Sequence, residues 1–117
     1  KPLKRNGTAS KVLKAVDEDF ESVVIKTSQK TPVVVDFHAE WCGPCHVLAP
    51  MLERLAVESN GKFILVKVSI DSNPLTADAH HVSAIPMVKM FKSGQVVAEF
   101  VGALPESEVR QWLSRHL

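Results

Sequence analysis

The chain's two cysteines, Cys42 and Cys45, lie in the stretch Trp41-Cys42-Gly43-Pro44-Cys45. An apolar strand pattern precedes this stretch, and an amphipathic helix pattern follows it. At the start of a helix, side chains three positions apart face one side of the first turn, so the two thiols can form a disulfide and open again. With only two cysteines, the spacing indicates a catalytic, redox or metal-binding pair rather than a framework of structural disulfides.

We expect the two thiols to differ in reactivity. Cys42 stands where the strand ends and the helix begins, and the helix N-terminus should lower the pKa of its thiol. Cys45 lies one turn further in and should be less exposed, while Gly43 and Pro44 keep the connection tight. The predicted reaction begins with attack of the Cys42 thiolate on a partner's disulfide. Cys45 then attacks the Cys42 sulfur and releases the reduced partner.

Asp36 interrupts the apolar run Val33–Ala39, a pattern typical of a central strand buried on both faces. Burial of an ionised carboxylate is costly, so the pKa of Asp36 should lie well above its usual value of about 3.9. A structural interpretation is a hydrogen bond to a neighbouring backbone group, but the nearby cysteine pair favours a buried proton acceptor. Lys67, in a second apolar strand, is a candidate partner for Asp36; a solvated lysine at a strand edge is the alternative.

The remaining patterns predict the elements that position this site. Strands are expected around Val12–Val16, at Val33–Ala39, Phe63–Ile70, Met87–Phe91 and Val96–Val101. A first helix is expected at Asp17–Ser28, with Asp17 as N-cap, and a second from the cysteine motif to Asn60-Gly61, with a kink at Pro50. A third should run from Pro74, with Asn73 as N-cap, to His80 or His81, and a last from Pro105 to the end. Lys92–Gln95 is a hairpin turn. Alternating strands and helices followed by a hairpin predict an α/β fold, with a mixed five-stranded sheet and helices on both faces.

Composition narrows the class of protein. The chain has 117 residues, of which 45% are hydrophobic and 23% charged, as expected for one globular domain. With 14 basic and 13 acidic residues, it lacks the basic surplus of nucleic-acid-binding proteins, and no apolar run approaches the roughly 20 residues of a membrane span. Residues 1–10 are polar and basic, and we interpret them as a flexible extension to a domain at 11–117. Because the chain begins at Lys1, this extension could follow a removed targeting segment or derive from a vector.

The segment Val35-Asp36-Phe37-His38-Ala39-Glu40-Trp41-Cys42-Gly43-Pro44-Cys45 closely resembles the thioredoxin family. Further matches are Lys67, Ile70-Asp71, Ile85-Pro86 and Phe100-Val101-Gly102, so that the resemblance covers about residues 11–117. It implies a central sheet flanked by four helices in three layers, and a protein-disulfide reductase.

The resemblance also implies roles for individual residues. Cys42 would be the nucleophile, Cys45 the resolving thiol and Asp36 the buried proton acceptor beside Lys67. A cis Ile85-Pro86 bond would face the cysteines and leave the Ile85 backbone free to pair with an extended substrate. A flat apolar docking patch would surround it, formed by Trp41, Gly43, Pro44, Ala84, Ile85, Pro86, Gly102 and Ala103.

No bound cofactor is expected, because NADPH and FAD would act indirectly, through a thioredoxin reductase. The other expected partners are disulfide-containing proteins such as peroxiredoxins, and the protein should be a monomer that binds neither nucleic acid nor membranes.

Three positions depart from the common pattern of the family. His38 stands where an aromatic residue is frequent, His46 where lysine is usual and Met87 where threonine is usual. His38 is shared with mitochondrial thioredoxins, and with the basic N-terminal segment it favours the mitochondrial matrix over the cytoplasm. His38 and His46 are predicted to tune the site; His46 replaces a fixed charge with one that titrates near neutrality. Met87 should make the docking patch more apolar and adaptable.

Three other functions compete with the reductase. A zinc site could use Cys42, Cys45 and His46 with His80 or His81, but adjacent helical histidines point in different directions. A non-catalytic binding domain would commonly have lost a cysteine. An oxidase or isomerase would commonly carry histidine between the cysteines, where this chain has Pro44.

Overall fold

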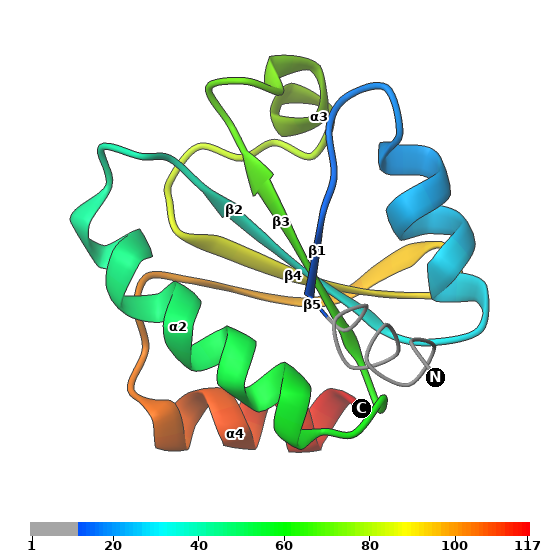
Figure 1. The fold of residues 1–117 in the computed structure, drawn as a ribbon, viewed down its shortest axis with the longest axis vertical. Helices are drawn as coiled ribbons and strands as arrows, with labels where there is room; N and C mark the ends of the chain where they lie inside the picture. The colour runs from blue at the N-terminus through cyan, green and yellow to red at the C-terminus, as the bar shows by residue number, and fades with distance from the viewer. Residues whose placement is uncertain (1–11) are drawn as a thin grey trace, which may run out of the picture.

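A mixed five-stranded sheet forms the centre of the computed structural model, which describes residues 12–117 (Figure 1). The strand order is β1-β3-β2-β4-β5. The strands are β1 (Val12–Lys14), β2 (Val33–His38), β3 (Ile64–Ser69), β4 (Met87–Lys92) and β5 (Gln95–Val101). β1, β3 and β2 are parallel, whereas β4 and β5 are antiparallel to their neighbours. The predicted α/β fold is confirmed; the extension predicted at residues 1–10 lies outside the described residues.

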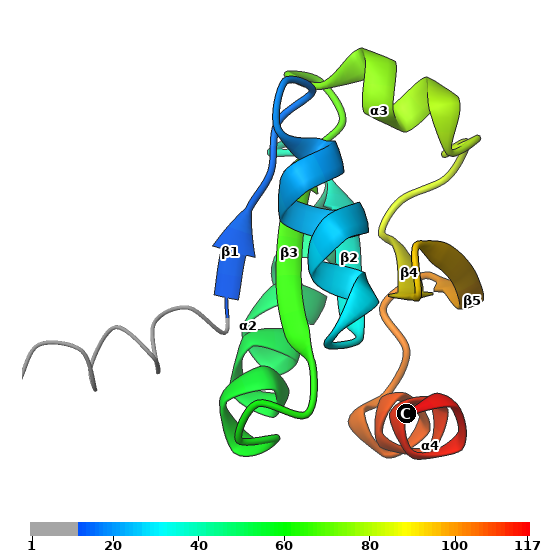
Figure 2. The ribbon, with the colours of Figure 1, turned by 90° about the vertical axis from the view of Figure 1, so that its right-hand side faces the viewer.

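Helix α2 (Gly43–Glu58) and helix α4 (Glu106–His116) cover one face of the sheet (Figures 1 and 2). The helical period places Leu48, Leu52 and Leu55 of α2 on the buried side, where they form a core with Val34 of β2 and Leu65 of β3. Because side chains alternate along a strand, Asp36 and Lys67, each two residues further on, leave the sheet on this same face. The core packing therefore aims both charged side chains at α2.

The first helical segment covers the opposite face, and the short helix α3 (Pro74–Ala79) lies beyond the end of β3 (Figure 2). The predicted helix at Asp17–Ser28 exists but is not a regular α-helix. Its main part is a π-helix, η1 (Glu21–Lys26), and a 3-10 turn, η2 (Thr27–Gln29), completes it. Phe20 and Val24 are buried as the spacing predicted, yet such spacing cannot separate hydrogen bonds to residue i−4 from bonds to i−5 over so short a helix.

The capping at Asp17 differs from the prediction. Its carboxylate accepts hydrogen bonds from the backbone N–H of Leu75 and Thr76 and from the Thr76 hydroxyl, so it caps α3 rather than its own helix. Asn73 precedes α3 as expected, but its side chain accepts from the Asp17 N–H and donates to the Ser69 carbonyl instead of capping the helix. The two residues thus join the first loop to α3.

Two tight reversals complete the frame. The β4–β5 hairpin turns at Ser93 and Gly94, with φ of 53° and 82°, and α2 is followed by Asn60 and Gly61, with φ of 56° and 92°. Positive φ at both central residues matches the twist of a two-residue hairpin. Among the described residues, the helices are too short or too polar to cross a membrane.

Candidate functional site

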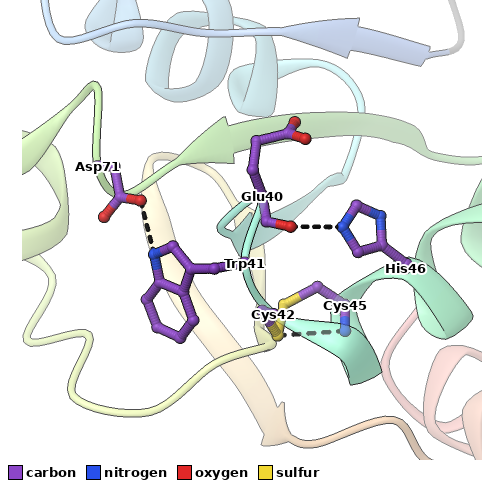
Figure 3. Close-up of a disulfide and its surroundings, with 6 residues drawn as sticks. All are labelled: Glu40, Trp41, Cys42, Cys45, His46 and Asp71. Carbon is purple, nitrogen blue, oxygen red and sulfur yellow. Dashed lines mark hydrogen bonds between the residues drawn. A yellow bond between two sulfur atoms is a disulfide. The ribbon is translucent and has the colours of Figure 1, made fainter.

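A disulfide between Cys42 and Cys45 lies at the start of α2 (Figure 3). Cys42 is the N-cap residue, and its sulfur accepts a hydrogen bond of 3.2 Å from the backbone N–H of Cys45. Pro44 in the first turn has the φ that a helix start needs and lacks an N–H that would remain unpaired. Both cysteines are buried, with 5% of Cys42 and 2% of Cys45 exposed, so the residue expected to attack first is slightly the more exposed of the two.

Two further contacts fix the polypeptide around the disulfide (Figure 3). The Trp41 indole, although 69% exposed, donates its Nε1–H to the Asp71 carboxylate at 2.7 Å. His46 donates from Nε2 to the Glu40 carbonyl oxygen at 2.7 Å, which ties the first turn of α2 to the segment before it. The family resemblance includes Asp71, but the sequence does not predict its contact with Trp41.

The residues expected in the docking patch lie in three segments. Trp41, Gly43, Pro44, Ala84 and Ala103 are exposed, Ile85 and Gly102 are half-buried, and Pro86 is buried. The Ile85-Pro86 bond is cis, as the resemblance implied. Ile85 packs against the cluster formed by Ala39, Cys42 and Cys45. The Gly102 N–H donates to the Pro86 carbonyl at 2.8 Å, which joins the segments after β5 and before β4. Within residues 12–117, the backbone of Ile85 forms no hydrogen bond, so its donor and acceptor are available.

Asp36 lies in the middle of β2 with no solvent exposure. Within the described part of the chain, neither carboxylate oxygen has a hydrogen-bond partner, so the structural interpretation as a hydrogen-bonded carboxyl is wrong. Burial raises the pKa of Asp36 to about 7, while the nearby Lys67 charge acts in the opposite direction. A carboxyl with this pKa can take up and release a proton near neutrality.

Lys67 is the register partner of Asp36 on the neighbouring parallel strand. Its ammonium, however, forms an ion pair with Glu53 of α2, at 2.7 Å, and not with Asp36. Lys67 is also not a lysine at a strand edge, because β3 lies between β1 and β2. Glu53 was not predicted; the available signal was that Cys45, Ala49 and Glu53 follow one another at intervals of four along one ridge of α2.

A pocket of about 170 Å³ opens beside Cys45. It is lined by His38, Ala39, Glu40, Cys45, His46, Ala49 and Lys67, so both predicted tuning histidines border it. His38 is half-buried, and this burial, assisted by the Lys67 charge, lowers the pKa of its imidazole. Cys45 therefore borders a small cavity although it is itself almost completely buried.

The zinc alternative finds no support in the geometry. The His80 ring packs near three phenylalanine rings, at centroid distances of 5.0 Å to Phe20, 5.5 Å to Phe91 and 6.2 Å to Phe37. Over residues 12–117, histidine, cysteine, aspartate and glutamate do not gather into any group of three that could hold a metal ion.

Comparison with known proteins agrees with this geometry. The thioredoxin family model matches residues 11–115. A thioredoxin of Haemophilus influenzae is 44% identical over 108 residues, which are 92% of this chain and 99% of that protein. A mitochondrial thioredoxin of Mus musculus is 43% identical over 97 residues, 83% of this chain but 57% of that protein, so the chain spans little more than half of the longer relative. Thioredoxins act without a bound cofactor. With its disulfide-bonded pair at the start of α2, the chain belongs to the thioredoxin family of thiol–disulfide oxidoreductases.

Proposed function

We propose that this protein reduces disulfides in partner proteins, with Cys42 as nucleophile, Cys45 as resolving thiol and Asp36 as proton acceptor. The observation that carries the proposal is the placement of the Cys42 sulfur at the N-terminus of α2, where the helix dipole and the Cys45 N–H stabilise negative charge. The buried Asp36 carboxyl, which has no hydrogen-bond partner within residues 12–117, supports the third role.

The reaction proceeds in two exchanges. The Cys42 thiolate attacks one sulfur of the partner's disulfide, forming a Cys42–partner bond and releasing the other partner sulfur as a thiolate. Asp36 then takes the proton of the Cys45 thiol, and the Cys45 thiolate attacks the Cys42 sulfur. The Cys42–partner bond breaks, the partner leaves with both sulfurs reduced, and the Cys42–Cys45 disulfide of the structure is formed.

The docking patch is the proposed site for the partner. An extended segment can pair with the free N–H and C=O of Ile85, while the apolar surroundings of Trp41 and Pro44 exclude water from the exchanging sulfurs. A thioredoxin reductase that uses NADPH would return the disulfide to the dithiol. Among substrates we propose peroxiredoxins, and we propose that the protein works as a monomer.

The proposed location is the mitochondrial matrix, with the cytoplasm as the alternative. His38 and the likeness to mitochondrial thioredoxins support it. Fractionation of source cells with an antibody to the chain tests the proposal; recovery in the cytoplasm alone would contradict it.

The activity is tested by NADPH consumption with thioredoxin reductase and insulin as the disulfide substrate. The unmodified protein should sustain turnover, and Cys42→Ser and Cys45→Ser should not. Its reduction potential should be more negative than the value of about −180 mV typical of protein disulfide isomerase. Absence of turnover with a correctly folded protein would favour a binding domain, and a potential near that of the isomerase would contradict a reductase.

A further inference from the structure

Two carboxylates, those of Asp36 and Glu53, lie on the side of the sheet toward which the Lys67 side chain points. Asp36 and Lys67 are opposite one another on parallel strands, and both side chains leave the sheet toward α2. The ammonium is nevertheless 2.7 Å from Glu53, while both oxygens of Asp36 remain without a partner in the described chain. Glu53 lies on the outer part of α2, and its side chain is 39% exposed against 22% for Lys67.

The pairing of Lys67 with Glu53, and not with Asp36, needs a physical explanation, because the lysine side chain is flexible. Its four-carbon stem allows the ammonium to reach different partners, and a buried carboxylate is a strong attractor for a cation. The Glu53 carboxylate, the more exposed partner of the pair, competes for that cation from α2, on the other side of the same helix–sheet interface.

We propose that Glu53 is a positioning residue whose carboxylate holds the Lys67 ammonium away from Asp36, so that Asp36 stays free to exchange a proton with Cys45. This inference rests on the proposed role of Asp36 as proton acceptor. If Glu53 were neutral, the ammonium would turn to Asp36 and hold it as a paired carboxylate, which is a poor base.

The test must distinguish the effects that the charged and titratable groups around Asp36 have on its pKa. Lys67 faces it from β3 and Glu53 from α2, and these are the two charges that act on its pKa. The pocket beside Cys45 is bordered in addition by His38, Glu40 and His46. The facing residue of β4, Val88, is apolar. Because the Glu53 charge itself raises the pKa of Asp36, its loss and the approach of Lys67 change that pKa in the same direction.

The test is the titration of the Asp36 carboxyl carbon by NMR in the oxidised protein, where the cysteines do not titrate. In Glu53→Gln, we expect the titration midpoint of Asp36 to fall by about one pH unit or more, as for an aspartate that gains a cation within 4–6 Å. Glu58→Gln is the matched control, because Glu58 lies on the same helix and pairs with Arg54 and Arg110. The control should leave the midpoint unchanged.

Combining Glu53→Gln with Lys67→Gln distinguishes two effects on Asp36: movement of the Lys67 ammonium, and the direct influence of the Glu53 charge. In Lys67→Gln, the ammonium is absent, so Glu53→Gln should shift the midpoint much less than it does in the unmodified chain. An unchanged midpoint in Glu53→Gln, or an equal shift in both backgrounds, would overturn the proposal.

The pH dependence of the step in which Cys45 releases the partner distinguishes a failure of the role proposed for Glu53 from a failure of the role proposed for Asp36. Release of a partner from its Cys42 mixed disulfide should show the same acid shift in Glu53→Gln as the NMR midpoint. If the midpoint moves and the profile does not, Lys67 is held by Glu53 but Asp36 is not the proton acceptor, which contradicts the role assigned to Asp36.

Discussion

Replacement of Asp36 by asparagine should make the protein more stable at pH 8 and leave it nearly unchanged at pH 4. The folded-state pKa of about 7 lies above the ordinary value of 3.8 because the carboxyl is buried. Between these two values, the folded protein holds a proton that the unfolded chain has lost. The stability contributed by Asp36 is therefore complete below pH 4, falls as the pH rises, and is lost above about pH 7.

The expected magnitude follows from the separation of the two pKa values. About three pH units at 1.36 kcal/mol each give a penalty of about 4 kcal/mol once Asp36 is ionised in the folded state. In Asp36→Asn, a neutral amide of similar size occupies the same buried position at every pH. The difference in unfolding free energy, variant minus unmodified protein, should therefore rise by about 4 kcal/mol between pH 4 and pH 8.

Urea unfolding of the two oxidised proteins measures this difference. Other groups with shifted pKa values, such as Asp17, Glu106 and His80, are present in both proteins, and their effects cancel in the difference. A difference that stays constant between pH 4 and pH 8 would show that Asp36 does not carry a raised pKa, and the account of the buried carboxyl would be wrong.

Two further predictions concern the frame of the site. Gly94→Ala should lower the unfolding free energy by about 1–3 kcal/mol, because Gly94 has a φ of 82°, which strains any residue with a Cβ; the flexible end of the Gln29 side chain, 2.8 Å from the added Cβ, can move aside. Gly43→Ala is its control: nothing lies within 4 Å of the added Cβ, so urea unfolding should show no loss, and equal losses in both variants would contradict the argument. Asp17→Ala should lower the urea midpoint at pH 7, since the carboxylate caps α3, whereas exposed Glu18→Ala should not. Because hydrogen bonding to Thr76 lowers the pKa of Asp17, the deficit should shrink as the pH falls through that lowered value; a deficit equal at all pH values would argue against capping.

The elements and the cysteine pair could be predicted from the sequence because their signals are local. The apolar run Val33–Ala39 and the period of Leu48, Leu52 and Leu55 each specify one element and its buried side. The burial of Asp36 follows from its position inside such a run, and its raised pKa follows from that burial.

The ion pairs and helix caps that could not be predicted are those in which a side chain has several possible partners. Lys67 has Asp36 opposite it in the sheet, yet Glu53 binds its ammonium from a helix 14 residues away in the sequence. Asp17 has the residue type and position of an N-cap, yet it caps α3 across the fold. Such choices depend on distances set by packing, which residue spacing alone does not encode.

In the proposed reaction, Cys42 attacks the partner's disulfide and Cys45 releases the reduced partner. The most direct measurement is mass spectrometry of the adducts formed when each serine variant is mixed with a disulfide-containing protein. Cys45→Ser should accumulate a mixed disulfide through Cys42 that dithiothreitol releases, and Cys42→Ser should form none. An adduct through Cys45 in the Cys42→Ser variant, with none in Cys45→Ser, would reverse the two roles and contradict the account.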